Sequence, residues 1–247
     1  MRPPAPDVHV VPAGDTAFLV EFPARMDAAI SACVIALWHD LRERRIPGVR
    51  DLVPAYATLA VYFDPLRTDV PALVALLERA AAAAGSAAEG SAAAPAVRPI
   101  HRIPVCYGGE LGPDLEEIAA ETGLSRDEVI RAHAGATYRV FMLGFMPGFA
   151  YMGEVDRRIA APRRPTPRLK VPAGSVGIAG RQTGIYPMAS PGGWRLVGRT
   201  PVRPFLPGRD PAFLFQAGDA VQFVPVALER FHELEALERE GGLRGGD

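Results

Sequence analysis

The side chains best suited to chemistry lie between Tyr138 and Phe205, and among them is the chain's only lysine, Lys170. The other 26 of the 27 basic side chains are arginine. An ammonium group is a compact point charge with three rotatable donors, whereas a guanidinium group is a planar fork that stays protonated. One lysine must also fall somewhere by chance. The residues around Lys170 therefore decide whether it is a functional candidate.

Three glycines follow Lys170 at every third position: Gly174, Gly177 and Gly180. Glycine permits positive φ and lets backbone amides approach a ligand, and successive amides can form an anion-binding nest. The spacing matches neither the P-loop nor the dinucleotide-binding fingerprint. The alternative interpretation is that these glycines turn a tightly wound barrel.

Polar and aromatic side chains flank these glycines. Cations near exposed amides suit a carboxylate or a phosphate, a glutamine can donate to and accept from an amide, and aromatic rings can wall a small pocket. Beside Arg168, Lys170 and Gln182, the candidate substrate-binding residues are Gly174, Ser175, Gly177, Gly180, Thr183, Tyr186, Trp194 and Arg199. The ordinary alternatives are a core position for Trp194 and a structural ion pair for Arg199.

An apolar run precedes this block and is broken by a Gly-x-x-Pro-Gly sequence at 144–148. Such a run can form barrel core, or it can form a loop that docks onto another protein. The candidate docking residues are Phe145, Met146, Pro147, Phe149 and Tyr151.

Several kinds of site are not indicated. No histidine lies between Tyr138 and Phe205, no Cys/His spacing resembles a metal site, and no Ser-His-Asp or Cys-His arrangement is recognisable. We therefore expect no metal and no covalent hydrolysis by this chain alone. Cys33 and Cys106 are expected to be buried thiols. The net charge of −1 does not indicate a nucleic-acid or membrane partner, and no apolar run reaches membrane-spanning length, so we expect a soluble cytoplasmic protein.

Hydrophobic periodicity predicts two domains, 1–84 and 98–240, joined by an Ala/Gly/Ser-rich linker at 85–97 and followed by a flexible tail at 241–247. The first domain reads strand, helix, strand, strand, helix, at 16–22, 27–44, 49–54, 58–63 and 70–83. This order resembles a split βαβ, ferredoxin-like layer that needs one more strand. Residues 98–105 could supply that strand or open the second domain.

The second domain begins with two short helices, one after Gly112-Pro113-Asp114 and one after a capping box at Ser125 and Glu128. Short β-like segments separated by Gly and Pro then run to Pro225, which is typical of a compact β-barrel or sandwich. A terminal helix is predicted at 227–240.

Four motifs carry a family resemblance: 142–153, 167–180, 182–187 and 190–201. Together they resemble the family of 5-oxoprolinase B subunits, also called allophanate hydrolase subunit 1, which includes an inhibitor of a sporulation histidine kinase. The similarity extends from Gly14 to about Pro225. It implies an α+β fold in which a small ferredoxin-like α/β N-terminal domain precedes a cyclophilin-like β-barrel domain.

The resemblance also implies an activity and partners. Such a chain acts with the carboxyltransferase-like C subunit and with the A subunit of 5-oxoprolinase to convert the lactam 5-oxo-L-proline to L-glutamate. ATP is a co-substrate of the complex, and which of the three chains binds it is left open. In this interpretation Lys170 and Arg168 supply positive charge and Gln182 contacts the lactam, as catalytic candidates. The alternative function is inhibition of a sensor histidine kinase.

Overall fold

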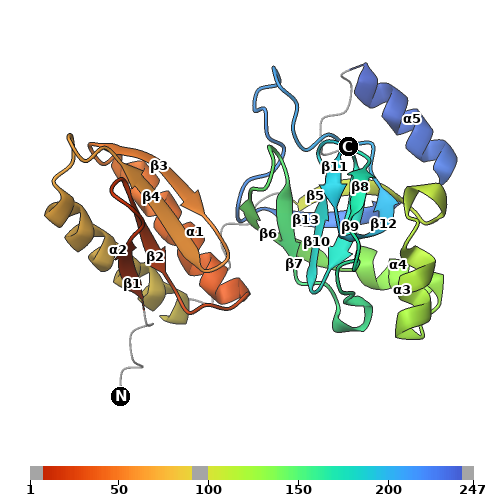
Figure 1. The fold of residues 1–247 in the computed structure, drawn as a ribbon, viewed down its shortest axis with the longest axis horizontal. Coiled ribbons are helices and arrows are strands. Elements are labelled where there is room, and N and C mark those ends of the chain that lie inside the picture. The colour runs from red at the N-terminus through yellow and green to blue at the C-terminus, as the bar shows by residue number, and fades with distance from the viewer. Residues whose placement is uncertain (1–7, 91–99, 241–247) are drawn as a thin grey trace. The chain divides into compact units, whose positions relative to one another are not determined.

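The computed structural model describes residues 8–90 and 100–240, and the chain divides into two compact units, 1–97 and 98–247 (Figure 1). The predicted tail at 241–247 and the second half of the predicted linker lie outside the described residues. Within the described ranges, no helix is both long enough and apolar enough to span a membrane.

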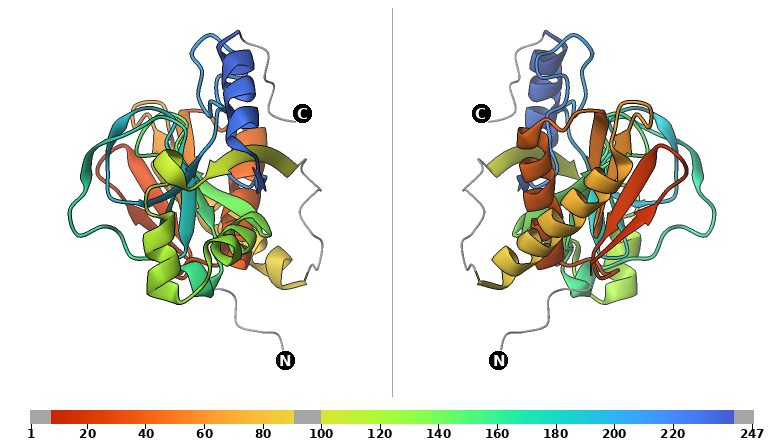
Figure 2. Two further views of the ribbon diagram at one scale, coloured as in Figure 1. Left: turned by 90° about the vertical axis from the view of Figure 1, so that its right-hand side faces the viewer. Right: turned by 90° about the vertical axis from the view of Figure 1, so that its left-hand side faces the viewer.

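The N-terminal unit is a four-stranded antiparallel sheet with two helices on one face (Figure 2). The strand order is β1-β2-β4-β3. Apolar side chains of β2, β4 and both helices form its core, with Val20, Val34, Leu59 and Leu77 fully buried. The elements are β1 (His9–Pro12), β2 (Ala17–Glu21), α1 (Ala28–Arg44), β3 (Val49–Pro54), β4 (Thr58–Phe63) and α2 (Val70–Gly90).

The structure decides one point of this unit that the sequence left open, and it differs from the sequence prediction at a second point. The additional strand of the sheet is β1, which pairs with β2, whereas the segment at 98–105 belongs to the second unit. Helix α2 continues to Gly90 and so includes the first part of the segment predicted as a linker. Alanine has the highest helix propensity, and this outweighs the absence of an amphipathic period.

The second unit is a closed seven-stranded barrel in the order β10-β7-β6-β13-β5-β12-β9. Parallel pairing of β5 with β13 joins the first and last strands of the unit. The α+β fold, with a small α/β unit followed by a β-barrel, is confirmed. The barrel strands are β5 (Ile100–Tyr107), β6 (Thr137–Leu143), β7 (Ala150–Gly153), β9 (Ser175–Ala179), β10 (Gln182–Ile185), β12 (Arg195–Arg199) and β13 (Ala220–Pro225).

Shorter elements surround the barrel. Strands β8 (Arg168–Val171) and β11 (Ser190–Gly192) pair in a separate ribbon. Helices α3 (Leu115–Thr122) and α4 (Arg126–Ala134) pack on the barrel core, and α5 (Leu228–Arg239) lies toward its other end (Figure 1). The capping box before α4 is confirmed: Ser125 Oγ accepts from the Glu128 N–H, and the Glu128 carboxylate accepts from the Ser125 N–H.

Candidate functional site

Lys170 lies on β8 with its side chain exposed. It forms no ion pair with the part of the chain that the structure describes. Leu169, the residue before it, is 92% exposed. The ribbon therefore presents an ammonium group that is available to a ligand or to another protein.

Arg168 has a different environment, because its guanidinium group donates to both carboxylate oxygens of Asp114 at 2.9 and 2.7 Å. Asp114 is only 2% exposed and also accepts from Arg164 and from the backbone N–H of Leu196. Burial alone would raise the pKa of Asp114, but the hydrogen bonds from Arg168 and Leu196 outweigh it and the pKa is lowered. Arg168 therefore fixes β8 to the start of α3 and to β12.

The sequence singled out Asp114 only as a residue at a helix start. Its side chain forms no cap on α3 and instead binds residues 50 or more positions away. The local Gly-Pro-Asp pattern contains no signal for partners at that separation, so sequence reasoning missed this buried ion-pair network.

The glycine repeat at 174–180 has a structural role in the barrel. The Gly174 N–H donates to the carbonyl of Tyr186 at 2.7 Å, and the Gly180 N–H donates to the carbonyl of Ala161 at 2.6 Å. Gly174 has a φ of 78°, and a Cβ there would lie 2.3 Å from the carbonyl oxygen of Thr200. The structure thus supports the interpretation that these glycines turn and pack the barrel, with the amides of Gly174 and Gly180 already bonded.

The barrel divides the predicted site residues into two groups. Ser175 pairs with Arg199 at one end of β9, whereas Gln182 pairs with Ala179 at the other end. Four strand steps separate these ends by about 13 Å. Gly174, Tyr186 and Arg199 therefore share one end of the barrel, and Gln182 lies at the other.

Thr183 is fully buried inside the barrel in a polar network around His133. Its hydroxyl donates to the carbonyl of Gly177 and lies 2.9 Å from His133 Nε2, while the Tyr107 hydroxyl lies 2.8 Å from Nδ1. Because the Thr183 proton is used on Gly177, Nε2 must donate and Nδ1 must accept. Burial lowers the pKa of His133 to about 3, which keeps the ring neutral.

The predicted aromatic residues form a small core beneath the ribbon. Trp194, Tyr186 and Phe149 are 5%, 2% and 1% exposed, and the Phe149 ring lies 5.4 Å from that of Trp194 and 5.3 Å from that of Tyr186. Tyr151 and Met146 pack against this cluster and are partly buried. The core position that was the alternative for Trp194 is the one observed.

The loop before β7 presents part of the apolar run to solvent. Phe145, with a φ of 69°, is 66% exposed, and its ring stacks edge-on against Phe149 at 5.7 Å. Pro147 is also exposed. The surface that this loop offers to another protein therefore consists of its tip, because Phe149 is buried.

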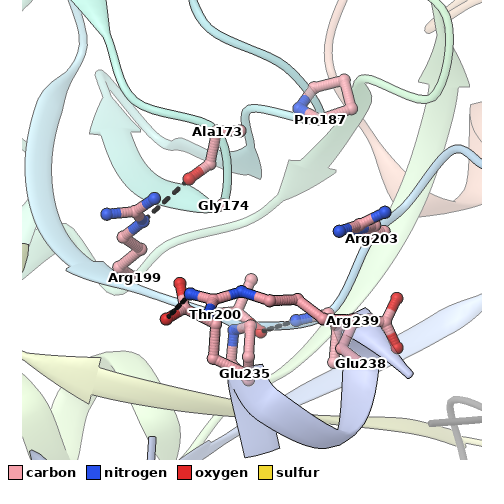
Figure 3. A pocket seen from close by; sticks show the side chains of 11 residues that line it. Ala173, Gly174, Pro187, Arg199, Thr200, Arg203, Glu235, Glu238 and Arg239 are labelled. Carbon is pink, nitrogen blue, oxygen red and sulfur yellow. Dashed lines mark hydrogen bonds and ion pairs between the residues drawn. The ribbon is translucent and has the colours of Figure 1, made fainter. Parts of the chain in front are cut away.

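A cavity of about 170 Å³ opens beside Arg199, between the end of β12 and α5 (Figure 3). The Arg199 Nε donates to the carbonyl of Ala173 at 2.8 Å. Sequence reasoning selected Gly174 and Arg199 here, but it missed the residues that complete the cavity from a distant part of the chain. These include Thr200, Arg203, Glu235, Glu238 and Arg239.

No group of three or more His, Cys, Asp or Glu side chains placed to hold a metal ion occurs within residues 8–90 and 100–240. Cys33 and Cys106 are buried free thiols, as predicted.

Comparison with known proteins gives consistent matches over most of the chain. Residues 8–215 match the family described as carboxyltransferase domain, subdomain C and D. The chain is 41% identical to the 5-oxoprolinase B subunit of Bacillus subtilis (strain 168) over 89% of its own length and 93% of the relative's.

Two solved structures agree. PH0987 from Pyrococcus horikoshii, described as a conserved uncharacterized protein, is 45% identical with a TM-score of 0.53, over 90% of this chain and 100% of that one. TTHA0988 is 38% identical with a TM-score of 0.73 over 85% of this chain, which spans 40% of that longer one. With its fold, its central motifs and a near full-length match in agreement, the chain belongs to the family of 5-oxoprolinase B subunits.

Proposed function

We propose that this chain is the B subunit of an ATP-dependent 5-oxoprolinase that, with the A and C subunits, converts 5-oxo-L-proline to L-glutamate. The observation that carries the proposal is the 41% identity to a named B subunit over 93% of that relative. Two further relatives with the same name are 54% and 47% identical over about half of this chain. These names favour the enzyme component over a histidine-kinase inhibitor.

The proposed chemistry follows from the substrate. A lactam is a resonance-stabilised amide with a poor leaving group, and ATP can activate its carbonyl oxygen by phosphorylation. Such a step depends on positioning and positive charge more than on a protein nucleophile. ATP thus enters as a co-substrate of the complex, without assignment to one of its chains.

Within this chemistry, Lys170 is the catalytic candidate that retains a free charge. Arg168 is committed to the buried Asp114 and acts as a positioning residue for β8. Gln182, on β10, and Arg199, on β12, pair with opposite ends of β9. The Arg199 side chain is also directed toward Ala173, so one small lactam cannot contact both residues. Gln182 therefore remains a candidate only for a site separate from that of Arg199.

The partner surface in this proposal is the exposed tip of the loop before β7, together with the β8 ribbon. Phe145 and Leu169 are large apolar side chains left 66% and 92% exposed. A partner chain covering Lys170 would also exclude water. The lower local dielectric would strengthen the interaction of the Lys170 ammonium group with a phosphorylated intermediate.

The proposal is tested by co-expressing this chain with candidate A and C subunits and measuring glutamate formed from 5-oxo-L-proline and ATP. We expect turnover by the complex and none by this chain alone. Robust glutamate formation by the single chain, or none by any combination that includes it, would contradict the proposal.

A further inference from the structure

The cavity beside Arg199 is lined by an excess of positive charge. Three guanidinium groups, those of Arg199, Arg203 and Arg239, face two carboxylates, those of Glu235 and Glu238. Figure 3 shows Arg199 and Arg203 on opposite sides of the hollow, with Arg239 between them. The local balance is one positive charge, which suits a ligand that carries a single negative charge.

Two of these three arginines, Arg199 and Arg203, have side-chain N–H groups that a ligand could use. The third, Arg239, pairs with Glu235 at 2.7 Å. Arg199 uses its Nε on the carbonyl of Ala173, which leaves both terminal nitrogens for a ligand. Neither Arg199 nor Arg203 forms an ion pair with residues in the described ranges. Planar guanidinium forks match carboxylate geometry well, so both walls of the cavity offer donors to a small acid.

Helix α5 forms one side of the cavity, and its buried apolar side chains hold it in place. Phe231 and Leu234 are buried, and near the helix end Glu238 is 6% exposed. The Glu238 carboxylate accepts from the backbone N–H of Arg203. Burial raises the pKa of Glu238, and the hydrogen bond and positive charge of Arg203 offset part of this rise. Glu238 therefore positions the segment that carries Arg203.

A second cavity shows what distinguishes the first. It has a larger volume, about 460 Å³, and lies between Cys106 and His232. Its one arginine, Arg126, already donates to the carbonyl of Tyr107. The larger space therefore lacks the pair of opposed cations that the smaller one has.

We propose that the cavity formed by Arg199, Arg203 and the end of α5 binds a small monocarboxylate. At about 170 Å³ it is smaller than the roughly 300–1,000 Å³ of sites for drug-sized ligands, which favours a small acid over a nucleotide. The inference rests on the proposed function in one respect, the choice of acid. We test 5-oxo-L-proline first because it is a lactam with one carboxylate and is the proposed substrate.

Calorimetric titration of the full chain tests this directly. We expect 5-oxo-L-proline to bind and pyrrolidin-2-one, the same lactam without its carboxylate, not to bind. Arg203→Gln and Arg199→Gln should each weaken binding at least tenfold, whereas Arg131→Gln, on the exposed face of α4, should leave it unchanged. Arg203 is exposed, so its variant tests the site even if Arg199→Gln fails to fold.

The inference would be overturned by the absence of heat with 5-oxo-L-proline, by equal binding of pyrrolidin-2-one, or by unchanged binding in Arg203→Gln. Inorganic phosphate binding in place of the carboxylate would also overturn it. The reconstituted complex separates this outcome from the proposed function. Turnover with an unchanged KM in Arg203→Gln would contradict the carboxylate site and support the proposed function. Carboxylate binding without turnover by the complex would support the site and contradict the function.

Discussion

At the residue scale, Lys170 and Arg168 show how two cations on one short strand can differ in role. Arg168 is anchored on a buried carboxylate, and Lys170 is exposed beside it. Arg168 therefore fixes the backbone from which the ammonium group projects.

We predict that Lys170→Ala lowers turnover of the assembled complex by about 10- to 150-fold, the equivalent of about 1.5–3 kcal/mol for one charge-assisted hydrogen bond. Lys170→Arg should also lower turnover although it keeps the charge, because a planar fork does not replace a compact ammonium. Glutamate formation is the measurement, and the circular dichroism spectrum should not change.

The matched control is Arg131→Ala, which removes an exposed cation from α4 and should leave turnover unchanged. Full activity in both Lys170 variants would show that the single lysine is an accident of composition.

His133 leads to a prediction about pH. Its folded-state pKa is about 3 and its ordinary value is 6.5, so the unfolded chain binds a proton more readily. The stability that neutral His133 contributes is complete above about pH 6.5 and is lost as pH falls toward 3, by up to about 1.4 kcal/mol per pH unit. Urea unfolding between pH 7 and pH 4.5 should show this loss.

In His133→Gln, which cannot titrate, the unfolding free energy should be lower at pH 7 and should depend less on pH. His232→Gln, at an exposed position of α5, should keep the wild-type slope. If the unfolding free energy of His133→Gln depended on pH as steeply as that of the wild type, this would contradict the role given to neutral His133.

The sequence supplied some of the residues of the candidate site and gave no signal for others. It selected Gly174 and Arg199 among the candidate binding residues, and the structure places these two residues side by side at one end of the barrel. It could not reveal that Gln182, on β10, pairs with the far end of β9, since strand register is set by pairing across the barrel. Arg203 and Glu238 escaped detection because their contact is long-range.

At the element scale, the Asp114 network joins α3, β8 and β12. We predict that Asp114→Asn lowers the unfolding free energy by about 3 kcal/mol, because two arginines lose their buried carboxylate. The value lies at the lower end of the range for such changes, since Arg164 and Arg168 keep part of their hydration. Urea denaturation measures it.

Asp156→Asn provides the comparison, because Asp156 pairs with Arg158 in a partly exposed position. Its cost should stay within about 1 kcal/mol. If the two aspartate variants were equally stable, the Asp114 network would not be what fixes β8.

Most elements followed from the sequence, and the features that did not follow have clear causes. Helix α1, predicted at 27–44, is capped by Asp27, and the predicted capping box at Ser125 starts α4. Strand β1 was missed because it is four residues long, ends in Pro12 and lies at a sheet edge, where proline is tolerated. Closure of the barrel through parallel pairing of β5 with β13 joins segments more than 100 residues apart, and local patterns do not record it.

At the scale of the whole molecule, the surface that we propose for the partner subunit is the exposed loop tip before β7. We predict that Phe145→Asp weakens association with the C subunit at least tenfold, because it places a charge in an apolar contact. Co-purification and calorimetry measure the loss. Leu66→Asp alters a 94% exposed apolar residue of the other unit and should have no effect. Unchanged association in Phe145→Asp would remove the loop from the interface.

The central claim is that this chain is one required component of an ATP-dependent lactam hydrolase. An omission series tests it most directly: the A and C subunits are assayed with and without the purified chain, and glutamate and ADP are quantified. We predict that both products form together only when all three chains and ATP are present. Glutamate formation at the same rate without this chain, or without ATP, would contradict the claim.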